Sequence, residues 1–219
     1  MNARAAVQLL KLFGLTYVIA IISAIIVHSL YASSTGQPAE TSEAFEAMSQ
    51  GASFIFIAVI LAPVIEELLF RSWLGRVWGV LLVMPLLLAA TASFALYGQR
   101  AAMPILSTFG ALVVLGSLAV YLQRYFNTQH IPNRHEQVVQ DLFPYIFWGA
   151  TVIFALIHVQ NHAGAGSPPL LIMLVMPQLI AGSVLGFVRM RFGLLTAIGF
   201  HGVYNGVALS LSYLANQAV

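Results

Sequence analysis

The stretch that decides the fold is 52-ASFIFIAVILAPVIEELLFRSWLG-75, an apolar run that contains two adjacent acids, Glu66 and Glu67, and a base, Arg71. An α-helix needs about 20 mostly apolar residues to cross the hydrocarbon core of a bilayer. An ionisable side chain at mid-bilayer costs roughly 2.5–3.5 kcal/mol on insertion scales, and such side chains usually face the bundle interior and serve a function. The stretch therefore predicts a membrane helix that carries a polar site.

The composition of the whole chain agrees with this interpretation. Of its 219 residues, 60% are hydrophobic and 7% are charged, and the mean hydropathy is +0.89. So few charges cannot cover the surface of a soluble domain, and the apolar excess excludes disorder. The absence of cysteine excludes a disulfide or cysteine–zinc scaffold. The nine Lys and Arg residues are scattered, so we expect no nucleic-acid partner.

Further apolar runs of similar length are spread along the chain and indicate helices rather than barrel strands. We therefore predict an all-α fold, a polytopic membrane bundle of about seven transmembrane helices. No repeat or second domain is visible, so residues 1–219 form a single integral membrane domain in this interpretation. The predicted spans are 8–31, 52–75, 78–97, 103–122, 142–160, 169–188 and 193–215.

The distribution of basic residues predicts the orientation. With the N-terminus in the cytoplasm, eight of the nine Lys and Arg residues fall on or near the inner side, and only Arg100 and the acidic loop 32–51 lie outside. A signal peptide cleaved after Ala32 is the alternative for the first segment. Because Leu30 is too large for a good cleavage site and the apolar run is long, we expect residues 1–32 to be a retained first span.

The acids of the second span differ in their helical positions. Glu67 and Arg71 are four residues apart, so they share one face and can offset each other's desolvation as an ion pair. Glu66 points about 100° away around the helix. We therefore expect Glu66 to find its partner on another span, where it is either protonated or in contact with a catalytic group.

Two later spans carry further polar residues. His158 ends the fifth span, where a lone histidine is typical of an interface, whereas His201 and Asn205 share a face of the seventh. A carboxylate and an imidazole can activate water, and a histidine with an asparagine can donate hydrogen bonds to an oxyanion. That set suffices for peptide hydrolysis without a nucleophilic side chain. Two pairs of glycines predict close packing of the sixth and seventh spans: Gly182 with Gly186, and Gly202 with Gly206.

These residues resemble the motifs of a known family. Glu66-Glu67-Leu68-Leu69-Phe70-Arg71 matches the EExxxR motif of the CPBP intramembrane proteases, the CAAX-protease and bacteriocin-processing family. Phe154-x-x-x-His158 resembles its FxxxH motif, and His201-x-x-x-Asn205 resembles its HxxxN motif. Pro63 and the glycine-rich sixth span also look like the family. The three motifs occur in the family's order.

One departure from the family concerns spacing. Arg71 and Phe154 are 83 residues apart, whereas the family has a few tens of residues between these motifs. We interpret 78–122 as an inserted helical hairpin, which preserves the direction of the following helix. The protease-like core would then comprise 52–79 and 142–215.

The resemblance implies a glutamate-dependent endopeptidase, similar to type II CAAX-prenyl endopeptidases. In it, Glu66 is the general base that activates water, assisted by His158, while His201 and Asn205 form the oxyanion hole. Glu67 and Arg71 order the site. We expect Glu66, His158, His201 and Asn205 to converge on one polar cavity within the bilayer.

We expect no cofactor, since the chain has no HExxH pair; zinc at Glu66, His158 and His201 is the alternative. The expected partners are the lipid bilayer and a membrane-associated peptide or protein substrate, in a bacterial cell or inner membrane. Two other functions stay open. The first is a non-catalytic member of the fold that acts as an immunity or scaffold protein. The second is a proton-coupled carrier, although its usual inverted repeat is not evident.

Overall fold

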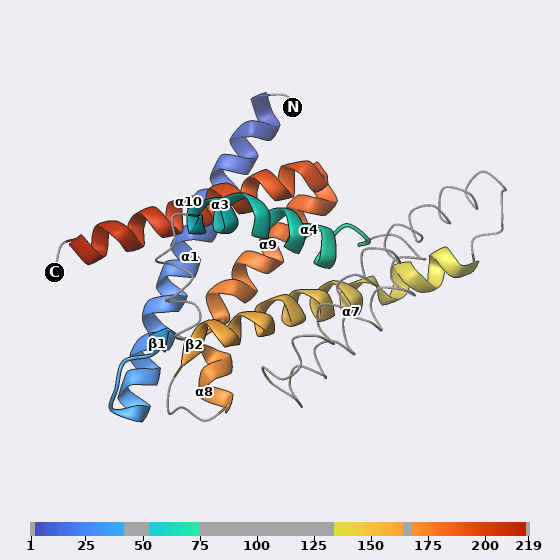
Figure 1. Cartoon of the computed structure of the whole chain (residues 1–219). Coiled ribbons are helices and arrows are strands. Elements are labelled where there is room, and N and C mark those ends of the chain that lie inside the picture. The colour runs from blue at the N-terminus through green and yellow to red at the C-terminus, as the bar shows by residue number, and fades with distance from the viewer. Residues whose placement is uncertain (1–2, 42–52, 75–133, 164–167, 218–219) are drawn as a thin grey trace. The chain divides into compact units, whose positions relative to one another are not determined.

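The computed structural model describes residues 3–41, 53–74, 134–163 and 168–217 (Figure 1). The predicted hairpin, 78–122, lies outside these residues. Apart from short turns and connections, the described residues form helices and one pair of two-residue strands. In chain order the elements are α1 (Ala3–Thr35), β1 (Glu40–Thr41), α3 (Phe54–Phe56), the π-helix η1 (Ile57–Leu61), α4 (Ala62–Phe70), α7 (Arg134–Leu156), the 3-10 helix η3 (Ile157–Asn161), β2 (His162–Ala163), α8 (Pro168–Met173), α9 (Met176–Phe192) and α10 (Leu194–Gln217).

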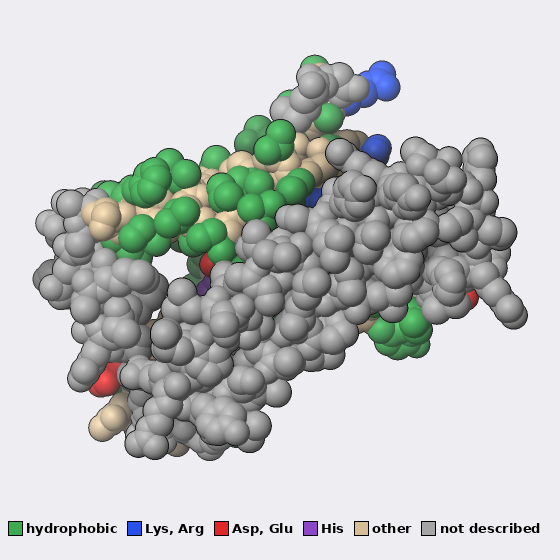
Figure 2. Space-filling view, turned by 45° about the vertical axis from the view of Figure 1, so that its right-hand side comes forward, with side chains coloured by type: hydrophobic (Ala, Val, Ile, Leu, Met, Phe, Trp, Pro, Cys, Tyr) green, Lys and Arg blue, Asp and Glu red, His purple; other side chains and the backbone are tan. Residues whose placement is uncertain are grey.

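Three helices among the described residues are long and apolar enough to cross a membrane: Ala3–Thr35, Asp141–Asn161 and Leu194–Ser212. They coincide with three of the predicted spans, and the count of seven stays a prediction. Large hydrophobic side chains point outward from them, including Leu10 at 73% exposure, Ile25 at 62% and Val203 at 57%. Figure 2 shows hydrophobic side chains over most of the described surface in view. A surface of this kind suits contact with lipid rather than water.

The sixth predicted span is not one continuous helix. It consists of α8, which ends at Met173, and α9, which begins at Met176. Pro177 explains the break, because its ring would clash with the carbonyl of Met173 four residues earlier and it has no N–H to donate. A proline in the first turn of α9 is tolerated, since that N–H has no partner within the helix.

The chain divides into two compact units, and each is described by itself. Unit 1 comprises Met1–Ile65 with Phe154–Val219, and unit 2 comprises Glu66–Ile153. In unit 1, α9 packs against both α1 and α10. Gly193, with φ of +95°, makes the turn between α9 and α10 that a residue with a side chain would adopt only under strain. The core of this packing is formed by Leu185, Val188, Ala197 and Phe200.

A second hydrophobic cluster of unit 1 lies where α1 meets α8. Val27, Tyr31 and Leu174 are buried there, and Ala39 packs against them. Ala39 leads into β1, which pairs antiparallel with β2 in the register Glu40↔Ala163 and Thr41↔His162. The short ribbon thus ties the segment after α1 to the segment that follows His158. No pattern in the sequence predicted this ribbon.

Candidate active site

The EExxxR segment lies in unit 2, at the end of α4. Arg71 Nη1 donates to Glu67 Oε1 over 2.6 Å, with Glu67 completely buried and Arg71 2% exposed. The backbone N–H of Arg71 bonds to the carbonyl of Glu67, so the helical spacing that aligns the two side chains extends one residue beyond Phe70. The predicted i, i+4 ion pair is therefore present. Each charge offsets the burial of the other.

The two adjacent carboxylates have different surroundings. Glu67 is buried, whereas the neighbouring Glu66 is only partly buried. This difference follows from the helix, which turns successive side chains about 100° apart. Glu67 therefore faces Arg71 on the buried side of α4, whereas Glu66 points about 100° away around the helix and is partly exposed. The distinction agrees with separate roles for the two acids.

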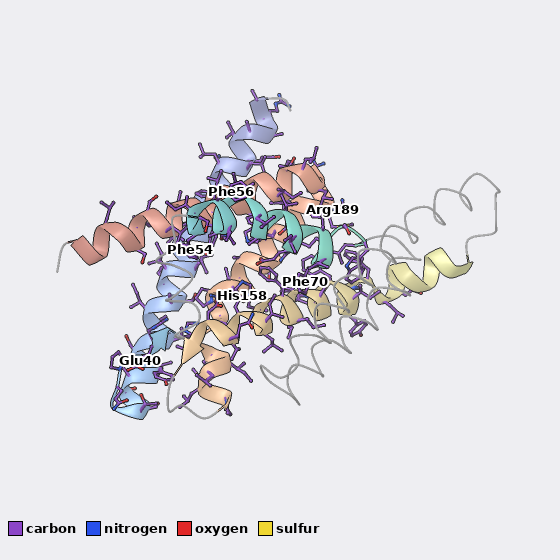
Figure 3. The ribbon with its side chains drawn as sticks, in the orientation of Figure 1. Glu40, Phe54, Phe56, Phe70, His158 and Arg189 are labelled. Carbon is purple, nitrogen blue, oxygen red and sulfur yellow. The ribbon has the colours of Figure 1, made fainter. Side chains whose placement is uncertain are left out.

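His158 lies in the 3-10 turn η3 that follows α7 (Figure 3). Its Nδ1 is 2.8 Å from the carbonyl oxygen of Phe154, four residues earlier. A carbonyl oxygen can only accept a hydrogen bond, so Nδ1 carries the proton and donates it. Nε2 then has the lone pair of the neutral imidazole, which suits it to accept a proton. The backbone of its own motif thus sets the tautomer of His158.

The ring of Phe154 brings two histidines together within unit 1. Its centroid is 4.9 Å from that of His158 and 6.0 Å from that of His201, with the second pair edge to face. Phe154 is 2% exposed and His201 is 4% exposed. The FxxxH and HxxxN motifs, on α7 with η3 and on α10, therefore meet at one buried aromatic ring. Phe154 was not among the predicted site residues, although its place in the FxxxH motif was the signal for it.

Asn205 contacts the second predicted span. Its Nδ2 donates to the backbone carbonyl of Ala58 in η1 over 2.8 Å. An asparagine amide has two N–H groups, so this bond uses one and leaves the other for a further acceptor. Asn205 therefore joins α10 to the helix that leads to the glutamates.

The glycines of α10 pack against a different helix from the predicted one. A Cβ built on Gly202 would lie 2.5 Å from the backbone oxygen of Val59, and one on Gly206 would lie 3.8 Å from the Val59 side chain. The predicted packing of the sixth and seventh spans is present, since α9 packs against α10, but Gly202 and Gly206 face η1 instead of α9. On α9, Gly182 and Gly186 are buried as expected for a packed helix.

The six predicted site residues fall in both units. His158, His201 and Asn205 belong to unit 1, and Glu66, Glu67 and Arg71 belong to unit 2. Convergence of Glu66 with the histidines stays a prediction. Within the described ranges, no three His, Cys, Asp or Glu side chains are grouped so that they could hold a metal ion.

Part of the chain matches a known protein family. Residues 119–207 match the family model described as Rce1-like, type II CAAX prenyl endopeptidase Rce1-like. The matched stretch contains Phe154, His158, His201 and Asn205 and begins after the EExxxR segment. No curated protein and no solved structure matches the chain.

Proposed function

We propose that this membrane protein is an intramembrane glutamic endopeptidase, because residues 119–207 match the Rce1-like family model of type II CAAX prenyl endopeptidases. Its substrate would be a membrane-associated peptide or protein. The observation that carries the proposal is the meeting of His158 and His201 at the ring of Phe154. His201 is buried at 4% exposure and His158 is partly buried, and two imidazoles at one place within an apolar bundle are costly unless they serve a function.

The first step is the activation of water. Glu66 takes a proton from a water molecule, and the lone pair on His158 Nε2 accepts a hydrogen bond from that water or receives the proton. The water oxygen attacks the carbonyl carbon of the scissile peptide bond. The fixed tautomer of His158 supports this role, since Nδ1 is occupied by the Phe154 carbonyl and Nε2 is the nitrogen with a lone pair.

The second step is the stabilisation and breakdown of the tetrahedral intermediate. His201 and the second N–H of Asn205 donate hydrogen bonds to the oxyanion. The carbon–nitrogen bond then breaks, and the proton held by Glu66 or His158 passes to the leaving amine. The Glu67–Arg71 ion pair keeps α4 ordered and engages the carboxylate of Glu67. Glu66 is therefore the acid of the two that exchanges protons.

The remaining features of the proposal follow from the sequence. The protein lies in a bacterial cell membrane or inner membrane. Its N-terminus is on the cytoplasmic side, because the basic residues gather on that side. The site needs neither a metal nor another cofactor. The substrate reaches it from the bilayer, and no nucleic acid takes part.

A cleavage assay tests the proposal. The purified protein is reconstituted in vesicles with membrane-anchored fluorogenic peptides, and cleavage is compared for the wild type, Glu66→Gln and Glu40→Gln. Glu66→Gln should lower the rate by roughly 10²–10⁴-fold, the usual contribution of a general base. Glu40 is exposed and lies on β1, so Glu40→Gln is the matched control and should cleave like the wild type. Equal cleavage by Glu66→Gln and the wild type would refute the mechanism.

One observation favours a second function. The family match begins after the EExxxR segment, so the matched part could be a scaffold that binds membrane proteins without cutting them. In that case the wild type would bind a membrane-anchored peptide and release no product. The same assay separates the two functions if peptide binding is measured along with cleavage.

A further inference from the structure

The helix that leads to the glutamates contains a π-helical turn, η1. The N–H of Ala62 donates to the carbonyl of Ile57, five residues earlier, as a π-turn requires. In the same register, the donor to the Ala58 carbonyl would be the N–H of residue 63. Residue 63 is proline, which has no N–H. The helix therefore offers Ala58 no donor in this register.

Asn205 supplies the missing donor. Its Nδ2 lies 2.8 Å from the Ala58 oxygen, although the two residues are 147 positions apart in sequence. Within a membrane bundle, a backbone carbonyl without a hydrogen-bond donor is costly, and a side chain of a neighbouring helix can supply that donor. The amide of Asn205 thus occupies the place of the N–H that Pro63 lacks.

Pro63 also accounts for the close approach of α10. In an α-helix, its ring would clash with the carbonyl of Val59, four residues earlier. The wider π-turn relieves the clash, and the Val59 oxygen lies where a Cβ on Gly202 would be only 2.5 Å away. Glycine permits this contact. Asn205 is three residues further along α10, on the same face as Gly202, so the contact brings its amide within reach of Ala58.

We propose that Pro63 is a positioning residue that reserves the Ala58 carbonyl for Asn205. By withholding an N–H, the proline leaves this carbonyl to one N–H of the Asn205 amide. The bond fixes the amide plane and therefore the direction of the second N–H. This inference rests on the proposed function, in which that second N–H stabilises the oxyanion.

A double-mutant cycle tests the inference. Pro63→Ala restores a backbone N–H that can bond to Ala58, and Asn205→Leu removes the side-chain donor at nearly constant size. Asn205→Leu should lower the melting temperature strongly when residue 63 is proline and much less when it is alanine. Pro144→Ala, at the proline inside α7, is the matched control. Its effect should add to that of Asn205→Leu, because the Asn205 amide bonds to Ala58 rather than to a carbonyl of α7.

Kinetics separate a positioning role from a purely structural one. Pro63→Ala alone should lower kcat by roughly tenfold and leave KM nearly unchanged, since a loosened oxyanion donor costs less than the 10²–10³-fold caused by its removal. In the double variant, stability should recover but kcat should not, because the donor is gone. Wild-type kcat in Pro63→Ala would refute the positioning role.

The two measurements also separate this inference from the proposed function. Additive shifts in melting temperature, as with Pro144→Ala, would refute the reservation of Ala58 whether or not the protein cleaves peptides. If the wild type cleaves nothing, the proposed function fails and the oxyanion role with it. Non-additive effects of Pro63→Ala and Asn205→Leu on the melting temperature would then still establish that Pro63 leaves the Ala58 carbonyl to the Asn205 amide.

Discussion

Replacement of Arg71 by alanine tests the role of the buried ion pair most severely. Glu67 is completely buried, Arg71 is 2% exposed, and their charged atoms are 2.6 Å apart. Removal of one partner leaves an uncompensated buried charge, which costs about 3–5 kcal/mol. In a chain of this size each kcal/mol lowers the melting temperature by roughly 2–4 °C, so the variant should melt roughly 6–20 °C below the wild type.

The assay is thermal unfolding of purified variants in the same detergent, followed by intrinsic fluorescence. Two further variants make it decisive. Glu66→Gln removes the neighbouring acid and should melt like the wild type while losing cleavage. Glu67→Leu with Arg71→Met removes both charges and should recover most of the lost stability, since replacement of a whole buried pair by apolar side chains is often neutral or stabilising. If Arg71→Ala melts at the wild-type temperature, or no lower than the double variant, the pair does not have the role assigned to it.

Three further predictions follow from the contacts of unit 1 and from the chemistry of the site. Gly202→Ala should cost about 1–3 kcal/mol of stability, because its Cβ would lie 2.5 Å from a backbone oxygen, whereas Gly206→Ala should be nearly neutral in the same melting assay, since its Cβ would meet only a side chain at 3.8 Å. Burial, and then the charges of His28 and His158, lower the pKa of His162 below its usual 6.5. As the pH falls, the His162 imidazole therefore takes up a proton in the unfolded chain before it does so in the folded protein. The melting temperature should be highest above about pH 6.5 and fall below that pH, and His162→Asn should make it less dependent on pH across that range. Elemental analysis of the active protein should find no stoichiometric zinc; inhibition by a chelator that zinc alone reverses would show that the site uses a metal.

The local part of the site could be predicted from sequence because helical geometry fixes it. The spacing of Glu67 and Arg71 aligns them on any helix, and the structure has the pair. Membrane-spanning helices could also be predicted, because the length and the apolar composition of a run indicate whether it can cross a bilayer. Three of the predicted spans coincide with helices that are long and apolar enough to do so. The resemblance to the CAAX proteases rested on short motifs and agrees with the family match.

The rest depends on which helices pack together, which spacing within one helix does not determine. The glycines of α10 indicated a close contact but not that η1 was the partner. The bond from Asn205 to Ala58 requires both the π-turn made by Pro63 and the approach of α10. The break between α8 and α9 could have been predicted, since Pro177 stands within the apolar run and a proline ends a helix that precedes it.

The most direct test of the account is whether Glu66 and His158 meet in the membrane. The chain has no cysteine, so paired cysteines can be introduced without a background. Glu66→Cys with His158→Cys should form a disulfide or a short cross-link in native membranes, as should the control pair Ala58→Cys with Asn205→Cys, whose parent residues are hydrogen-bonded. Cross-linking of both pairs is the result that the account predicts. Cross-linking of the control pair alone would contradict it, because Glu66 could not then activate a water molecule together with His158.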